Sequence, residues 1–407
     1  MADTEPLPAI GNDADTKPME AIPPPLVARN GLNGLTVYVG FVLLSFWGLQ
    51  VSTSPSRLDL EGDNEPAGTN QNERVIGSVR RILLEKDSVT ALAWDDKSER
   101  LAVGSANGQL ELWSVRLGKK IWQFQHTEPA ITVAFSTFVD RRELPGAIRD
   151  RDTHDLLYSV HGQRIDDGFI SCQLVCWDLK SSRRLFRKRL KMSKVVSVAF
   201  DSLGRTLAAT ALNRIEIWHL DSLRWRWRQS QGLYPLAIAA GGEEGADVLV
   251  AGARGQVALV MRGVEVHITE KLYPTSMTAV ALSANGRRAA SGFASDGSSN
   301  KMAPVIYWKN WDQGEEARQI LSGTPGEVLK LFFAGTNQLY AWWVTYGEGD
   351  EKQRTSRLTA WDLGEGRLSG HMKLPEDTKT CALSPDGKWV ATGLVGGEVH
   401  IDPVVLQ

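Results

Sequence analysis

The stretch C-A-L-S-P-D-G-K-W-V-A-T-G-L-V-G-G-E-V-H-I, residues 381–401, predicts three short β-strands joined by tight turns. Apolar runs at 381–383 and 389–392 flank the tetrapeptide Ser-Pro-Asp-Gly at 384–387. Pro presets φ, Asp hydrogen-bonds to its own backbone and Gly accepts a positive φ, so the tetrapeptide is a turn. The third run, 398–401, follows a pair of glycines. Three strands of this length cannot bury their own faces, which raises the question of whether the unit recurs.

The unit does recur along the chain, with a spacing near 40–50 residues. The clearest markers are alternating apolar runs, which predict the third strand of each unit, and five of the seven end in Trp or Trp-Asp. They lie at 110–113, 174–178, 215–218, 257–260, 305–308, 358–362 and 399–402. Each marker follows a run that predicts a first strand, and these runs lie at 89–94, 131–135, 195–200, 236–240, 277–282, 328–333 and 378–383. The repeats predict an all-β domain.

With these repeats, the turn at 384–388 and the Trp-Asp pairs at 177–178 and 361–362, the chain resembles the WD40-repeat β-propeller family over about residues 79–404. The resemblance implies seven blades of four strands. Outer strands are expected at 120–125, 183–190, 223–229, 265–272, 317–321 and 367–373. The last blade lacks an outer strand, and the resemblance implies that residues 79–85 supply it and close the ring. Closure removes exposed sheet edges.

One departure from the family pattern concerns its polar tetrad of His, Ser/Thr, Asp and Trp. His126 could act as the tetrad histidine of one blade, whereas Asn107, Asn213 and Arg254 stand where Asp is expected. We therefore expect a divergent propeller that is held together mainly by packing between blades.

The composition is that of an average globular protein, with 407 residues, 42% hydrophobic and 23% charged. A net charge of -2 gives no overall attraction to nucleic acid, so no nucleic-acid partner is expected. The 3 cysteines are too few for a disulfide framework. Cys172 and Cys176 would lie on one strand about 13 Å apart, too far to form a bridge.

The N-terminal region divides into three segments by composition. Residues 1–31 are rich in Pro and acidic residues and predict a disordered arm. Residues 34–52 carry no charge and predict one transmembrane helix, about 28 Å long and close to the thickness of a hydrocarbon core. A cleaved signal peptide or a buried element is the alternative. Residues 53–77 are polar and predict a flexible linker.

The orientation of the membrane helix can be predicted from the basic residues that flank it. Lys17 and Arg29 precede the helix and Arg57 follows it. This count favours an N-terminus in the cytoplasm and a single-pass membrane protein with its propeller on the non-cytoplasmic side.

Three expanded loops are expected on the face where second strands turn into third strands, at 163–171, 295–303 and 346–356. Loops on a rigid scaffold often carry function. The candidate partner-binding residues in them are Arg164, Asp166, Asp167, Tyr346, Glu348, Asp350, Lys352 and Arg354. The alternative is that these loops are tolerated surface insertions.

A basic rim is expected on blades 2 and 3. Its candidate residues are Arg141, Arg142, Arg184, Arg187, Lys188, Arg189, Arg224 and Arg226. The rim could protect strand edges, contact anionic lipid headgroups or bind an acidic protein.

The sequence contains no motif for a cofactor, and its histidines lack metal-ligand spacing, so no cofactor, metal or catalytic residue is assigned. We interpret the chain as a membrane-anchored, non-catalytic propeller scaffold for protein partners whose identity the sequence does not give. The alternatives are a structural subunit of a larger membrane complex and a periplasmic or lumenal propeller enzyme.

Overall fold

The computed structural model describes residues 81–84, 87–136, 155–166, 168–202, 204–211, 214–220, 224–229, 234–241, 247–261, 265–268, 275–294, 305–310, 318–321, 326–335, 337–346 and 354–407. The predicted arm, membrane helix and linker, at 1–31, 34–52 and 53–77, lie outside these ranges. The regular elements within these ranges are strands. None of the described ranges contains a helix that is long and apolar enough to cross a membrane.

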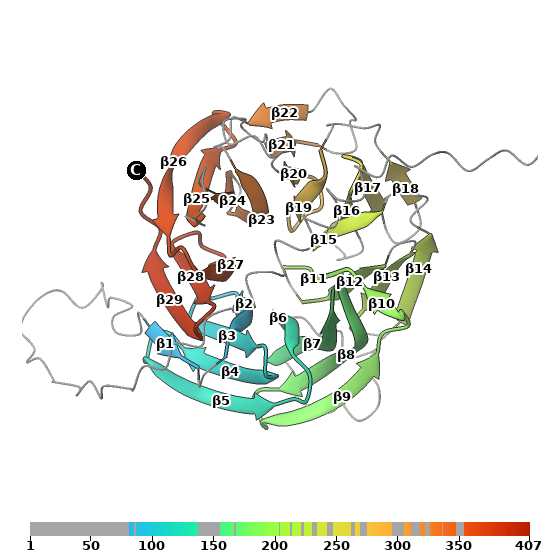
Figure 1. Cartoon of the computed structure of the whole chain (residues 1–407), viewed down its shortest axis with the longest axis vertical. Helices are drawn as coiled ribbons and strands as arrows, with labels where there is room; N and C mark the ends of the chain where they lie inside the picture. The colour runs from blue at the N-terminus through green and yellow to red at the C-terminus, as the bar shows by residue number, and fades with distance from the viewer. Residues whose placement is uncertain are drawn as a thin grey trace, which may run out of the picture. The chain divides into compact units, whose positions relative to one another are not determined.

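Seven antiparallel sheets make up the described part of the chain, and each is one blade (Figure 1). Blade 1 is formed by β2 (Val89–Trp94), β3 (Arg100–Ser105), β4 (Gln109–Ser114) and β5 (Lys119–Gln125). Blade 2 is formed by β6 (Ala130–Ser136), β7 (Leu156–Ile165), β8 (Gly168–Asp178), β9 (Arg183–Arg189) and β10 (Lys194–Val195). Blade 3 is formed by β11 (Ser197–Phe200), β12 (Thr206–Ala211), β13 (Arg214–His219) and β14 (Arg224–Gln229).

Blades 4 and 5 are formed by β15 (Pro235–Gly241), β16 (Asp247–Gly252), β17 (Val257–Met261) and β18 (Glu265–Ile268), and by β19 (Met277–Leu282), β20 (Ala289–Phe293), β21 (Val305–Trp308) and β22 (Arg318–Leu321). Blade 6 is formed by β23 (Glu327–Ala334), β24 (Gln338–Tyr346), β25 (Arg354–Asp362) and β26 (Arg367–Leu374). Blade 7 is formed by β27 (Thr378–Leu383), β28 (Trp389–Leu394), β29 (Glu398–Pro403) and β1 (Arg81–Leu83).

The ring closes through pairing between the two ends of the described chain. β1 is antiparallel to β29, with Ile82 opposite Val399 and Arg81 opposite His400. The side chain of Ile82 is 1% exposed and packs with Val399 in one buried cluster. The first strands of successive blades contact one another all the way round, from β2 through β27 and back to β2. The prediction of a seven-bladed propeller closed by an N-terminal strand is therefore confirmed.

The turn at 384–387 has the predicted chemistry. Ser384 Oγ donates to Asp386 Oδ1 at 2.6 Å and accepts from the backbone N–H of Trp389 at 2.9 Å. Gly387 takes a φ of 71°, a conformation that favours glycine. Other blades use Asp at the position of Ser384, as Asp95 does in blade 1, where its Oδ1 accepts from the backbone N–H of Glu99 and of Arg100.

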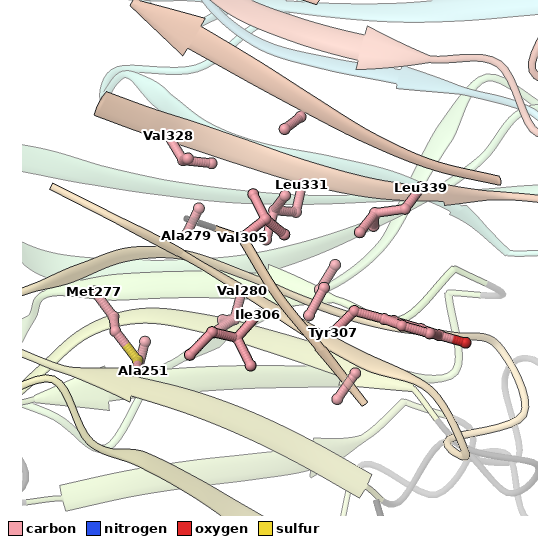
Figure 2. Packing of buried hydrophobic residues seen from close by; sticks show 14 of the residues in the cluster. Ala251, Met277, Ala279, Val280, Val305, Ile306, Tyr307, Val328, Leu331 and Leu339 are labelled. Carbon is pink, nitrogen blue, oxygen red and sulfur yellow. The ribbon is translucent and has the colours of Figure 1, made fainter. Parts of the chain in front are cut away.

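Apolar side chains fill the spaces between blades. The largest buried cluster draws on blades 4, 5 and 6, and Figure 2 shows Ala251, Met277 and Val328 among its members. Burying a side chain of the size of Val or Leu contributes about 1.5–3 kcal/mol. Packing between blades therefore carries much of the stability, as the loss of the polar tetrad predicts.

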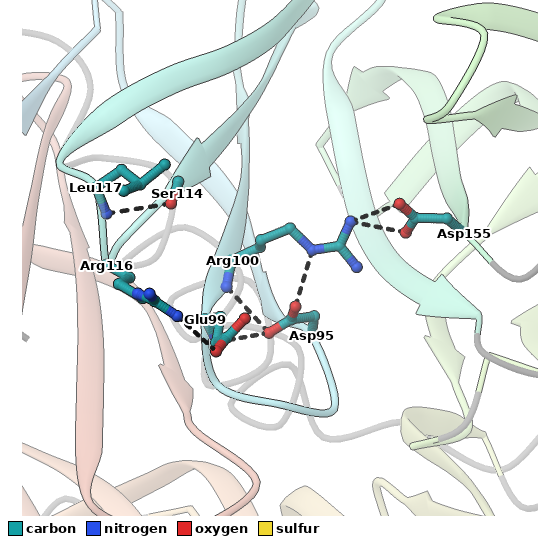
Figure 3. Close-up of polar contacts among 7 residues, drawn as sticks. All are labelled: Asp95, Glu99, Arg100, Ser114, Arg116, Leu117 and Asp155. Atoms are coloured by element: carbon teal, nitrogen blue, oxygen red, sulfur yellow. Dashed lines mark hydrogen bonds and ion pairs between the residues drawn. The ribbon is translucent and has the colours of Figure 1, made fainter. Parts of the chain in front are cut away.

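Polar contacts also join blades 1 and 2, at the end of the blades where first strands turn into second strands. The side chain of Arg100 bridges Asp95 of its own blade and Asp155 of the next (Figure 3). Its guanidinium lies 5.2 Å from the centroid of the Phe135 ring. Arg116 and Glu99 approach to 3.8 Å nearby, but both are exposed.

Two predictions about blades 2 and 3 were wrong in detail. Residues 163–171 were expected to form an expanded loop, but β7 and β8 continue through most of this segment as a hairpin, with Arg164 opposite Phe169. Residues 195–200 were expected to form one strand. Instead Val195 pairs with Phe169 of blade 2, and the pairing within blade 3 begins at Ser197, because the lengthened β8 reaches the entry to blade 3.

Candidate functional site on the top face

The top face, as we define it, is the end of the blades where first strands begin and second strands turn into third strands. In six blades the first strand has a β-bulge at its second or third residue. The residues at the bulges are Thr90, Ile131, Leu236, Thr278, Leu329 and Lys379. A bulge turns one side chain out of the regular pairing, so these residues occupy equivalent positions around the top of the ring.

Three of the bulge residues bond to the next blade. Thr90 Oγ1 donates to the carbonyl oxygen of Ala130 at 2.6 Å, and Thr278 Oγ1 donates to that of Val328 at 2.6 Å. Lys379 Nζ donates to Ser88 Oγ, which joins blade 7 to blade 1. These bonds fix the tops of blades 1 and 2, 5 and 6, and 7 and 1 against one another, which favours a rigid top face at these three junctions.

Two cations of different blades, Lys379 and Arg164, act on each other at the top face. Burial and, to a smaller extent, the positive charge of Arg164 lower the pKa of Lys379 to about 8, while Asp87 acts in the opposite sense. The hairpin of blade 2 therefore brings Arg164 close enough to act on a residue of blade 7. Arg164 and Asp166 are both exposed on this hairpin.

A second polar group lies at the top of blade 6. Tyr346 is opposite Arg354 in the pairing of β24 with β25, and its side chain is 49% exposed. Arg354 Nη1 donates to the carbonyl oxygen of Glu376 at 3.3 Å, while its Nε is buried without a hydrogen-bond partner among the described residues. Burial lowers the pKa of Arg354, against the favourable charges of Tyr346, Asp377 and Glu327.

Glu327 supplies the negative charge of this group. Its side chain is 8% exposed, and burial raises its pKa to about 7 although Arg354 acts in the opposite sense. Glu327 therefore titrates near neutral pH. Carboxylates with such shifts concentrate at functional sites.

Exposed apolar side chains complete the top face. Tyr234 and Leu236 lie at the entry to blade 4, and Val395 lies at the turn between β28 and β29. The guanidinium of Arg254 lies 4.7 Å from the centroid of the Tyr234 ring. Aromatic residues and arginines of this kind are enriched at the centres of protein interfaces.

The predicted partner-binding residues divide into two sets. Arg164, Asp166, Tyr346 and Arg354 lie on the top face, whereas Asp167, Glu348, Asp350 and Lys352 lie outside the described residues, as does the predicted loop at 295–303. Glu327, Lys379, Tyr234 and Leu236 were not predicted as site residues from the sequence. A signal for Lys379 exists in the repeats, because aligning the first strands places it at the position of Thr90 and Ile131.

The predicted basic rim is described in part. Arg184, Arg187, Lys188 and Arg189 are exposed on β9. Arg224 and Arg226 belong to β14, the outer strand of blade 3, but their side chains lie outside the described ones. Arg141 and Arg142 also lie outside the described residues.

His126 does not form the tetrad expected of it. Its ring stacks on that of His161 at a centroid distance of 4.1 Å, and its Nδ1 accepts from the backbone N–H of Glu128 at 3.0 Å. His161 Nε2 lies 3.0 Å from Ser159 Oγ, which also accepts from Trp177 Nε1 at 3.0 Å. In blade 2, therefore, Trp177, Ser159 and His161 form a substitute network.

A closed ring of seven antiparallel blades, six of four strands and one of five, defines the described part of the chain as a β-propeller. Residues 78–137 match the family model described as the anaphase-promoting complex subunit 4 WD40 domain. The match and the ring of seven blades together support a WD40-repeat β-propeller. No curated protein matches it. Propellers of this kind are typically non-catalytic scaffolds for protein interaction.

Proposed function

We propose that this chain is a non-catalytic scaffold that binds a protein partner on its top face and is anchored in a membrane by residues 34–52. The observation that carries the proposal is that Tyr234, Leu236, Tyr346 and Val395 are all exposed at the top ends of their blades, on the face that also holds Arg164, Arg254 and Arg354. A rigid face of aromatic, aliphatic and arginine side chains can bury an apolar centre and still pair with polar groups at its border.

The membrane anchor would confine partners to a surface and raise their effective concentration at the propeller. Its support is the uncharged segment 34–52. The propeller would lie on the non-cytoplasmic side, as the flanking basic residues predict.

Partner binding can be tested by purifying the tagged full-length protein from its native membranes and quantifying the proteins that co-purify. The variant Tyr234→Ala, Tyr346→Ala should lose a specific partner that the wild type retains. A matched control, Leu117→Ala, Ile320→Ala, changes apolar residues that are even more exposed but lie away from the top face. Equal recovery of every partner with the top-face variant would contradict the proposal.

The anchor is tested separately by alkaline extraction of membranes. The wild type should stay in the membrane pellet, and Leu43→Arg, Leu44→Arg should move to the supernatant, because two charges in the centre of the segment oppose insertion. Release of the wild type by alkali would remove the anchor from the proposal and leave partner binding untouched.

A further inference from the structure

The outer strand of blade 2 presents an exposed row of cations. All of them belong to β9 or follow it closely: Arg183, Arg184, Arg187, Lys188, Arg189 and Lys191. The segment offers no acidic residue between Arg183 and Lys191 to balance them.

None of these six cations forms an ion pair with another described residue. Cations of other outer strands do form such pairs. On β5, Lys120 Nζ lies 2.8 Å from Glu111 Oε1, and on β26, Lys373 Nζ lies 3.2 Å from Glu376 Oε1. Six like charges on one short segment repel one another, so blade 2 differs from its neighbours in lacking compensation within the described part of the chain.

The backbone edge of β9 lies beside these charges. Among the described residues β9 pairs with β8 alone, so its outward N–H and C=O groups have no strand partner there. Successive side chains of a strand point to opposite faces, so Arg187 and Lys188 lie on opposite sides of this edge. On one face of the strand, the ring of Phe186 lies 6.2 Å from that of Tyr158, measured between centroids. On the other face, the positive charges of Arg187 and Arg184 help to lower the pKa of His126.

The outer edge of another blade already accepts an extra segment. The C-terminal residue Gln407 pairs with His371 of β26 through two backbone hydrogen bonds of 3.0 Å and 3.1 Å. Gly370 makes room for it, since a Cβ atom there would lie 2.8 Å from the carbonyl oxygen of Gln407. Leu406 packs against the buried cluster of blades 6 and 7.

We propose that β9 is a docking edge for an extended acidic segment of a partner protein, which adds to blade 2 as a further strand. The backbone edge supplies the hydrogen bonds, and the cations on both sides of it pair with acidic side chains of the incoming strand. The same charges repel a second β9, so they prevent pairing between copies while selecting an acidic partner. This surface is separate from the top face and does not depend on the membrane anchor.

The test measures binding of a fluorescent peptide of alternating Thr and Glu, long enough to cover β9, to the purified full-length chain. We expect saturable binding that weakens with salt and falls about tenfold in Arg187→Glu, Arg189→Glu. The matched control is Arg367→Glu, Lys373→Glu on β26, which should bind as the wild type does. Lys188→Gln, Arg189→Gln serves as a milder variant in case charge reversal impairs folding, and should weaken binding in the same direction.

Two further peptides separate strand addition from simple charge attraction. A peptide of alternating Thr and Gln should not bind, since it lacks the charges. A Glu peptide with methylated backbone nitrogens at alternate positions keeps the charges but loses hydrogen bonds on one edge, and should bind about tenfold more weakly. If the methylated peptide binds as well as the parent, no strand is added and the proposal is wrong.

Two other occupants would also overturn the proposal. The first is a lipid surface. If vesicles containing phosphatidylserine compete fully with the peptide, and the charge-reversal variant is the only variant that fails to bind these vesicles, the edge is a lipid contact. The chain's own acidic stretch at 59–65 could occupy the edge instead. In that case the peptide would bind only after Asp59, Glu61, Asp63 and Glu65 are changed to Asn or Gln.

Discussion

Arg100 of blade 1 donates from Nη1 to both carboxylate oxygens of Asp155 in blade 2, at 2.7 Å each. The side chains are 26% and 39% exposed, so solvent weakens the attraction. A double-mutant cycle with Arg100→Gln and Asp155→Asn should give a coupling energy of about 0.5–1 kcal/mol in urea unfolding. The control pair, Arg116 and Glu99, should show no measurable coupling. Equal coupling for both pairs would mean that the contact does not join the blades.

Close approach between blades predicts a large cost for one small substitution. A Cβ atom at Gly393 of β28 would lie 2.4 Å from Cγ1 of the buried Val89 in blade 1. Gly393→Ala should lower the free energy of unfolding by about 1–3 kcal/mol, since overpacking shifts both blades. Gly396→Ala is the control, because a Cβ there meets nothing within 4 Å, and it should leave the urea midpoint nearly unchanged.

The buried carboxyl of Glu327 predicts a pH dependence that can be removed. Its pKa is about 7 in the folded chain against an ordinary value of 4.5, so the folded state binds more protons between these pH values. Its contribution to stability is therefore full below pH 4.5 and is lost as the pH rises through 7. Glu327→Gln should flatten the stability profile in this window. An unchanged slope in the variant would show that another group titrates.

The stacked histidines predict destabilisation by acid. His161 has a pKa of about 3 because of burial and the neighbouring His126, against an ordinary 6.5. The unfolded chain therefore binds more protons between pH 3 and 6.5, and stability falls as the pH falls, by up to about 1.4 kcal/mol per pH unit. His161→Gln should reduce this loss, whereas the exposed control His371→Gln should retain it. The measurement is the urea midpoint at several pH values.

Ring closure predicts that a residue at one end of the described chain stabilises the whole domain. Ile82→Ala should cost about 2–5 kcal/mol and keep a single cooperative transition. The exposed neighbour Arg81 gives the control, since Arg81→Ala should change stability by no more than about 0.5 kcal/mol. Loss of only part of the unfolding signal would show that blade 7 unfolds separately and that closure does not support the other blades.

Much of the fold could be predicted from the sequence, because each blade repeats the same apolar pattern and the seventh lacks its own outer strand. The missing outer strand predicted that an N-terminal segment completes blade 7, and Ile82 of β1 does lie opposite Val399 of β29. The hairpin at Arg164 could not be predicted, because Asp166, Asp167 and Gly168 suggest a loop whether or not the strands beside them are lengthened. The split between Val195 and Ser197 depends on that hairpin and was missed with it.

The site was less predictable than the fold. Tyr346 and Arg354 were found because they flank an expansion between strands. Glu327 and Lys379 were not found, because a single charge beside an apolar run looks like an ordinary strand end. Their shifted pKa values arise mainly from burial, and this burial exists only in the folded chain.

Closure by β1 has a consequence for synthesis of the chain on the ribosome. Residues 81–83 are made early, but their partners at 398–400 are almost the last to be made. At about 5–20 residues per second, β1 waits roughly 16–60 s for its partner. Until then the nascent chain has no way to complete blade 7, and the cell must protect its apolar surfaces for the whole of that interval.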